Sequence, residues 1–222
     1  RGPVPSGDGS DLYPDVIVGR APVADAVGAD AFVDKCLAYE RTPTPHFTDR
    51  NLYLAEVLFP YDWQTGAYSF DGGEHVIEKA TTPVPDHIHE VKLYANKDGF
   101  PESYPLDEVA AVDSIERGYN IVVHVGHGNK DIMRVGYNNY LTMSDMSSLS
   151  NGSSKSSVFW LLNCTSAAID FDCIAERCIE NPAGGGVAAV GPTRYAFPAT
   201  LRDYYWDWID ILYSDPDPRA GT

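Results

Sequence analysis

Short apolar runs alternate along the chain with longer segments whose apolar residues recur at helical spacing. Runs of this length are too short for helices and are typical of strands buried on both faces of a parallel sheet. We expect strands over residues 15–20, 51–59, 90–94, 121–125, 158–162 and 187–191. Helical spacing predicts helices over residues 24–40, 75–80, 106–117, 169–179 and 201–213. This alternation predicts an α/β fold with a mostly parallel sheet that helices cover on both faces.

Two segments interrupt the alternation. Residues 61–73 are rich in aromatic residues and glycine and have no clear period, so we expect a long loop of the kind that often carries function. Residues 147–157 read as a polar, serine-rich linker. The chain has 222 residues, of which 44% are hydrophobic and 22% are charged, and no internal repeat is visible. These proportions predict one globular domain over residues 1–222.

Acidic side chains strongly outnumber basic ones. The chain carries 32 Asp and Glu against 16 Lys and Arg, a formal net charge of -16. This balance argues against a nucleic-acid partner and against binding to anionic membranes. No apolar run approaches the roughly 18 residues that span a bilayer, and the chain does not open on a signal-peptide pattern. We therefore expect a soluble polypeptide with no membrane span.

Two of the predicted strands end close to a reactive side chain. The strand at 121–125 leads to His127, and the strand at 158–162 leads to Cys164. Chemistry in open α/β sheets gathers beyond the carboxyl ends of parallel strands, so we expect these side chains at one edge of the sheet. An imidazolium within hydrogen-bond reach lowers the pKa of a thiol and supplies thiolate near neutral pH. The pair predicts a thiol nucleophile and its base.

Glycine flanks the histidine on both sides, at Gly126 and Gly128. Residues without a Cβ let a substrate backbone approach a site closely. The N–H groups of Gly128 and Cys164 are expected to hold the oxyanion of a tetrahedral intermediate. His124 lies within the same strand and is interpreted as a packed or hydrogen-bonded histidine.

The remaining candidate ligands form no convincing metal site. Cys36, Cys173 and Cys178 lack the short paired spacings of zinc ligands, so they are interpreted as buried hydrophobes, with one disulfide among them as the alternative. His87 and His89 are interpreted as part of a solvated edge.

An acidic cluster near the start of the chain is the candidate calcium site. Asp8, Asp11 and Asp15 lie among glycine and short polar residues and offer the oxygen ligands that a hard cation prefers. The spacing is not that of an EF-hand loop, and an ordinary turn is the alternative. The chemistry predicted for Cys164 requires no cofactor.

Four sequence blocks carry a resemblance to a known family. They are residues 14–22 with Tyr39 and Glu40, residues 125–128, residues 163–166 with Asp170, and residues 180–195. In this order they are similar to the catalytic domain of the gingipain family of cysteine peptidases, which are relatives of the caspases and legumains. The resemblance implies a caspase-like α/β/α sandwich over residues 1–222, in a chain that lacks an N-terminal portion of the family's domain.

The resemblance also implies roles for individual residues. Cys164 would be the nucleophile, His127 the catalytic histidine and Glu56 the nearest candidate for a third catalytic acid. The acid that binds a basic substrate side chain would be Asp71 or Glu74. The pocket for the side chain before the scissile bond would include three residues of the last block and its continuation: Thr193, Tyr195 and Phe197, of which Phe197 stands where a tryptophan is common in the family.

The function implied is a secreted or cell-surface endopeptidase that cleaves a polypeptide substrate after Arg or Lys, through an acyl-enzyme. Accessory domains of a longer precursor would be its other partners. One alternative is a sorting or maturation transpeptidase of a secretion system. Another is a non-catalytic binding module on a decayed peptidase scaffold, which the presence of both His127 and Cys164 disfavours.

Overall fold

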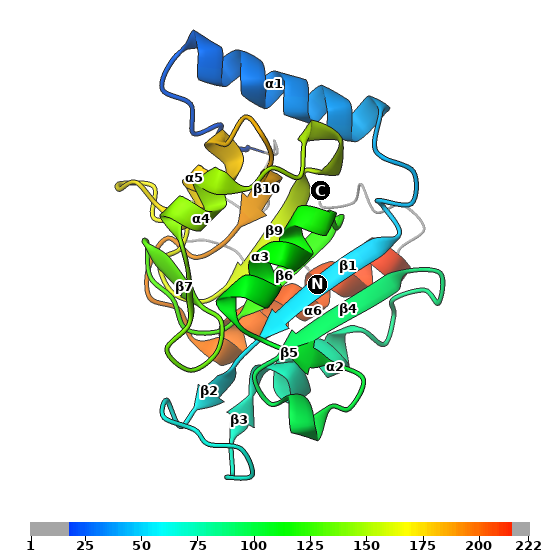
Figure 1. Cartoon of the computed structure of the whole chain (residues 1–222), viewed down its shortest axis with the longest axis vertical. Helices are drawn as coiled ribbons and strands as arrows, with labels where there is room; N and C mark the ends of the chain where they lie inside the picture. Colours follow the sequence, from blue (N-terminus) through cyan, green and yellow to red (C-terminus); the bar gives the residue numbers. More distant parts are fainter. Residues whose placement is uncertain (1–17, 215–222) are drawn as a thin grey trace, which may run out of the picture.

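A six-stranded parallel sheet forms the centre of the computed structural model, which describes residues 18–214 (Figure 1). Its strands are β1 (Arg50–Ala55), β4 (His89–Tyr94), β5 (Tyr104–Pro105), β6 (Ile121–Val125), β9 (Ser157–Leu162) and β10 (Gly186–Val190). They lie in the order β10-β9-β6-β1-β4-β5. The chain builds one side of the sheet from β1 outward and then returns to place β6 on the other side of β1. Open α/β sheets bind ligands at such a switch point.

Helices cover both faces of this sheet. Leu52 and Leu54 of β1 point to the core beneath α3 (Glu108–Arg117), α4 (Met143–Ser148) and α5 (Ile174–Glu180). The alternate residues Tyr53 and Ala55 point to the other core, beneath α2 (Glu78–Ala80) and α6 (Pro198–Ser214). Figure 1 shows α3 in front of the sheet and α6 behind it. The predicted α/β/α sandwich is therefore confirmed.

The predicted strand over 51–59 is wrong beyond Ala55. The chain leaves the sheet at Glu56, and β2 (Val57–Phe59) pairs antiparallel with β3 (Phe70–Asp71). Much of the predicted loop 61–73 connects these two short strands. The apolar pattern continues past this break, because Val57 and Leu58 of β2 are buried like the residues of β1.

Other boundaries also differ from the sequence-based elements. The helix predicted over 169–179 begins only at Ile174, since residues 165–171 form turns instead. The helix predicted from His75 begins as a π-helical turn, η1 (Gly73–Ile77). A hairpin of β7 (Ile132–Arg134) and β8 (Tyr140–Thr142) was not predicted, and neither were two 3-10 turns, η2 (Lys97–Gly99) and η3 (Ser153–Lys155).

The strand predicted over 15–20 lies partly outside the described residues. Within them, residues 18–20 carry no strand, and Val18 is 83% exposed. The apolar residues of this run therefore do not form a buried strand of the sheet over the part that is described.

Helix α1 (Ala26–Arg41) contacts the domain through a buried lysine. Asp25 caps the N-terminus of the helix, with a side chain that accepts from the Gly28 N–H, and the helix runs across one end of the sheet in Figure 1. The Nζ of Lys35, a residue only 1% exposed, donates to carbonyls around the end of α5 and the start of β10. Its acceptors are the oxygens of Ile179, Asn181, Gly184 and Gly186. Burial lowers the pKa of this lysine, but the carbonyl dipoles replace its water shell.

We expect Lys35→Met to destabilise the domain by about 3 kcal/mol or more, because it leaves buried carbonyls without a donor while keeping the apolar stem. Urea unfolding measures this change. Lys97→Met, at an exposed position, is the control and should change stability by less than about 0.5 kcal/mol. Equal stability of the two variants would show that Lys35 does not anchor α1.

Candidate active site

The ends of three neighbouring strands meet at one edge of the sheet. Ala55 at the end of β1 pairs with Val125 of β6, and Val125 in turn pairs with Leu162 of β9. The residues that follow these strands, Glu56, His127 and Cys164, are therefore brought to the same edge. The sequence-based placement of the histidine and the cysteine at one edge agrees with this register.

A backbone carbonyl fixes the orientation of the His127 ring. Nε2 lies 2.7 Å from the carbonyl oxygen of Leu58 in β2. A carbonyl can only accept, so Nε2 carries the proton and Nδ1 of the neutral ring keeps its lone pair. Within residues 18–214 Nδ1 makes no hydrogen bond. The rings of Phe59 and Tyr61 pack against the imidazole, with centroids 5.7 Å and 5.2 Å away.

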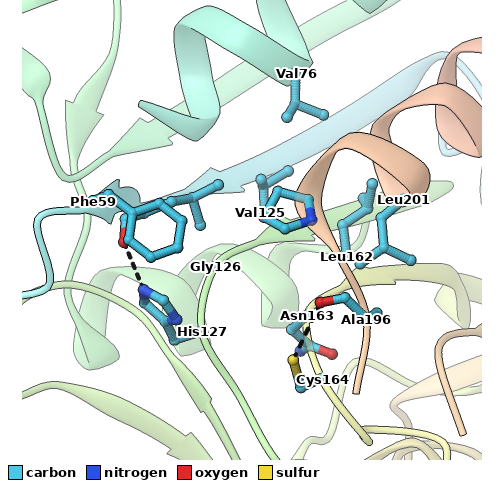
Figure 2. Close-up of a pocket in the computed structure, with 12 residues that line it drawn as sticks. Phe59, Val76, Val125, Gly126, His127, Leu162, Asn163, Cys164, Ala196 and Leu201 are labelled. Carbon is cyan, nitrogen blue, oxygen red and sulfur yellow. Dashed lines mark hydrogen bonds between the residues drawn. The ribbon is translucent and has the colours of Figure 1, made fainter. Parts of the chain in front are cut away.

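Cys164 lies at a tight turn directly after β9. Its Sγ is half-buried and lies 3.7 Å from the carbonyl oxygen of Ala196. The next residue, Thr165, has a φ of 51°, in the left-handed region that favours glycine. Figure 2 shows His127 and Cys164 on opposite sides of one pocket. This cleft has a volume of about 540 Å³, part of it open to solvent.

The two backbone N–H groups that the sequence predicts to hold an oxyanion lack a partner within residues 18–214. Gly128 pairs with Met133 in a bridge whose hydrogen bonds are made by the neighbouring residues Asn129 and Arg134. The N–H of Gly128 therefore has no acceptor within the described residues, and the same holds for the N–H of Cys164.

The glycines around His127 make room for other side chains of the chain itself. A Cβ added at Gly126 would lie 2.7 Å from Oε2 of Glu56, and one at Gly128 would lie 2.9 Å from Nδ2 of Asn163. Both distances are shorter than real Cβ contacts. Packing within the chain therefore requires glycine at both positions, in addition to the close approach of a substrate that the sequence predicts.

Glu56 is a buried carboxylate that binds the backbone of His127. It is 1% exposed, and its Oε2 accepts from the His127 N–H at 2.9 Å. Its Oε1 accepts from the Gly136 N–H at 3.2 Å and pairs with Nε of Arg134 at 3.1 Å. Burial nevertheless raises the pKa of Glu56 to about 7. The predicted third acid thus lies next to the histidine but contacts its amide and not its ring.

His124 and Asn163 form a second buried pair under the site. Nε2 of His124 donates to the Arg134 carbonyl at 2.7 Å, so Nδ1 accepts from the Asn163 amide at 3.2 Å. Complete burial lowers the pKa of His124 to about 4, which keeps the ring neutral. The prediction of a hydrogen-bonded strand histidine is confirmed.

The residues predicted to bind the substrate side chain do not line this pocket. Tyr195 and Phe197 are 88% and 79% exposed, and the neighbouring residues Ala196 and Pro198 line the cleft instead. Thr193 lines a separate hollow together with Asp170 and Arg194.

The two acids predicted to bind a basic side chain also lie outside the pocket lining. Asp71 is 1% exposed, and its Oδ1 accepts from the Gly73 N–H at 2.7 Å. The side chain of Glu74 is 61% exposed and lies next to His75. Sequence reasoning missed the apolar lining residues, because nothing in the sequence separates them from core residues: Leu58, Val76, Leu162 and Leu201.

The calcium prediction falls outside the described residues, since Asp8, Asp11 and Asp15 all precede residue 18. Between residues 18 and 214 no group of three or more His, Cys, Asp and Glu side chains is arranged to hold a metal ion. Cys36, Cys164, Cys173 and Cys178 all carry free thiols. In the same part of the chain, every helix is too short or too polar to cross a membrane.

Comparison with solved structures supports the fold. The crystal structure of the Arg-specific cysteine proteinase gingipain R (RgpB) matches 88% of this chain with a TM-score of 0.69 and 15% identity. A complex of the pro- and mature domains of RgpB from Porphyromonas gingivalis matches 90% with a TM-score of 0.69 and 16% identity. The chain spans less than half of these proteins, 44% and 46% of their chains. No curated protein sequence matches it significantly.

A sequence model of Peptidase family C25 matches nearly the whole chain, over residues 5–222. Together with the gingipain fold, this match confirms the resemblance inferred from the four sequence blocks. The chain belongs to Peptidase family C25, a family of cysteine peptidases.

Proposed function

We propose that this domain hydrolyses peptide bonds with Cys164 as nucleophile and His127 as the proton carrier. The observation that supports it best is the hydrogen bond from His127 Nε2 to the Leu58 carbonyl. This bond leaves Nδ1 as the only ring atom that can exchange a proton, in a ring that lines the same cleft as the thiol. In Figure 2 the second ring nitrogen lies on the side of the ring nearer Cys164.

The reaction then follows from these atoms. Nδ1 of His127 takes the thiol proton, and Sγ of Cys164 attacks the scissile carbonyl carbon. The N–H groups of Gly128 and Cys164 stabilise the negative oxygen. The intermediate collapses as Nδ1–H protonates the leaving amine, which leaves a thioester on Sγ. Water attacks this thioester, gives a proton to Nδ1 and releases the acid, after which the proton returns to the sulfur.

Glu56 acts in this proposal as a positioning residue. Its carboxylate holds the His127 amide, and the strand that follows it supplies the Leu58 carbonyl that holds the ring. Backbone and ring of the histidine are thus fixed by residues close together in sequence. Direct proton transfer between Glu56 and the imidazole is not part of this role.

Other parts of the predicted function follow from the resemblance and not from contacts in the described residues. Cleavage after Arg or Lys is what the resemblance implies, and the structural neighbour gingipain R is an Arg-specific proteinase. Export to the cell surface, calcium binding and accessory domains rest on the resemblance and on residues outside 18–214. A transpeptidase would use the same thioester with an amine in place of water, and no contact in the described residues favours that acceptor.

We expect Cys164 to be the thiol that iodoacetamide labels first at neutral pH. Burial raises the pKa of Cys36 and Cys173, and that of Cys178 to about 12, so these three stay protonated and slow. His127→Ala should slow labelling of Cys164 at least about tenfold, because it removes the acceptor of the thiol proton. Mass spectrometry of the labelled peptides measures both. Equal labelling of Cys164 with and without His127 would contradict the dyad.

Cys164→Ala and His127→Ala should each lower peptide hydrolysis by at least about 10³-fold and leave folding intact. Cleavage of a mixed peptide library followed by mass spectrometry measures the loss. Cys36→Ala is the matched control and should retain the rate of the unmodified chain. A Cys164→Ala variant that still cleaves would refute the assignment of the nucleophile.

The buried Glu56 should make stability fall as pH rises. Between pH 4.5 and 7 the folded state keeps the Glu56 proton that the unfolded state loses, since the folded pKa is about 7 and the ordinary value is 4.5. By linkage this contribution falls by about 3 kcal/mol across the window and then stays constant. Glu56→Gln should remove it, as measured by urea unfolding at pH 4.5 and pH 7.5. Glu102→Gln, at an exposed position, is the control and should keep this pH dependence of stability. The same change of stability with pH in both variants would show that Glu56 titrates normally.

A further inference from the structure

The catalytic cleft continues inward into an apolar recess. Beyond His127 and Cys164 its walls are formed by Leu58 of β2, Val76 of η1, Val125 of β6, Leu162 of β9 and Leu201 of α6. Figure 2 shows Val76, Val125, Leu162 and Leu201 together on one side of the two reactive residues. The first four are at most 5% exposed and belong to the core between the sheet and α6.

No carboxylate reaches this recess within the described residues. Its lining includes no Asp or Glu, and its ionisable members are His127 and Cys164 themselves. Asp71 does not line the recess, and the position of a Cβ on Gly73 would lie 3.1 Å from Asp71 Oδ1 and 2.9 Å from the Tyr94 ring. That carboxylate therefore lies on the side of β4, whereas Gly72 packs against Val125 at the recess.

The chemistry of the lining decides which side chain fits. A guanidinium or ammonium group in this recess would lose its water shell without gaining a carboxylate partner, which is unfavourable. An aliphatic or aromatic side chain would lose only contact with water, which is favourable. The recess is continuous with a cleft that opens to solvent beside His127 and Cys164, so a substrate side chain can reach it from there.

We propose that the recess selects an aliphatic or aromatic residue before the scissile bond, such as Leu, Met or Phe, and not Arg or Lys. The proposal rests on the peptidase function proposed above. The residue that is acylated onto Sγ of Cys164 carries its side chain closest to the catalytic groups, and the recess is the hollow that begins there. Selectivity then comes from burial of an apolar side chain and from the absence of an acid.

Leu201 is the position at which the selectivity can be altered with least damage. It is only partly buried and lies in the first turn of α6, where a negative charge is favourable to the helix. Leu201→Asp would place a carboxylate at the recess, and Leu201→Trp would fill it. Ile211→Asp introduces the same charge at an exposed position of the same helix and serves as the control.

The test uses peptides that differ only in the residue before the cut: Leu, Phe, Ala, Arg and Lys. We expect kcat/KM for Leu or Phe to exceed that for Arg and Lys at least about 100-fold. Leu201→Asp should raise the Arg to Leu ratio at least about tenfold, and Leu201→Trp should lower the rate with Leu and Phe more than that with Ala. Ile211→Asp should change none of these ratios. Rates with Arg or Lys equal to or above those with Leu would overturn the proposal.

A binding measurement separates this proposal from the peptidase function. Peptides that end in Leu or Arg mimic the product and are titrated into Cys164→Ala by calorimetry. Binding of the Leu peptide at least about tenfold tighter supports an apolar recess even without turnover, and equal or tighter binding of the Arg peptide overturns it. Failure of the intact chain to cleave any peptide, with Cys164 unlabelled by iodoacetamide, would refute the peptidase function instead.

Discussion

One buried carboxylate connects the strand ends on which the site depends. Glu56 follows β1 and accepts from the His127 N–H after β6, so it fixes the positions of the two strand ends at the switch point of the sheet. Through Gly136 and Arg134 it also holds the β7–β8 hairpin and its turn. A neutral side chain of the same size could satisfy only some of these donors. The sheet would still form, but the histidine would lose the contact that fixes its backbone.

This arrangement has an energetic consequence. Two N–H groups and a guanidinium favour the charged form of Glu56, yet burial outweighs them and raises the pKa of the carboxyl to about 7. The site is therefore held by a group that is close to half-charged near neutral pH. When the Glu56 carboxyl loses its proton, its hydrogen bonds become stronger, so it holds the His127 backbone more firmly. The same deprotonation leaves a charge buried in the protein, which is unfavourable. As pH rises, the position of His127 is therefore fixed more firmly, whereas the stability of the fold decreases.

The sequence was sufficient where a feature depends on strand order and strand ends. The apolar runs of β6 and β9 predict both strands correctly even though His124 lies within β6, and because these strands are neighbours, His127 and Cys164 meet at one edge. The sequence was insufficient where the chain leaves the sheet inside an apolar run. Glu56 stands within such a run, and only the structure shows that it accepts from several backbone donors and turns the chain out of the sheet. The exposure of Tyr195 and Phe197 depends likewise on how one turn is oriented.

The recess could not be predicted because its residues serve two purposes. Val125 and Leu162 pack in the core beneath α6 and also line the cleft, and an apolar residue has the same appearance in a sequence in either place. This double use limits how the pocket can vary. A smaller side chain at Val125 would enlarge the recess and also leave a cavity in the core, whereas a charge there would be buried among apolar side chains. Leu201 is partly exposed at the start of α6, so a change there alters the cleft with less effect on the core. On the proposed function, substrate preference would therefore change more easily along the α6 side of the cleft than along its sheet side.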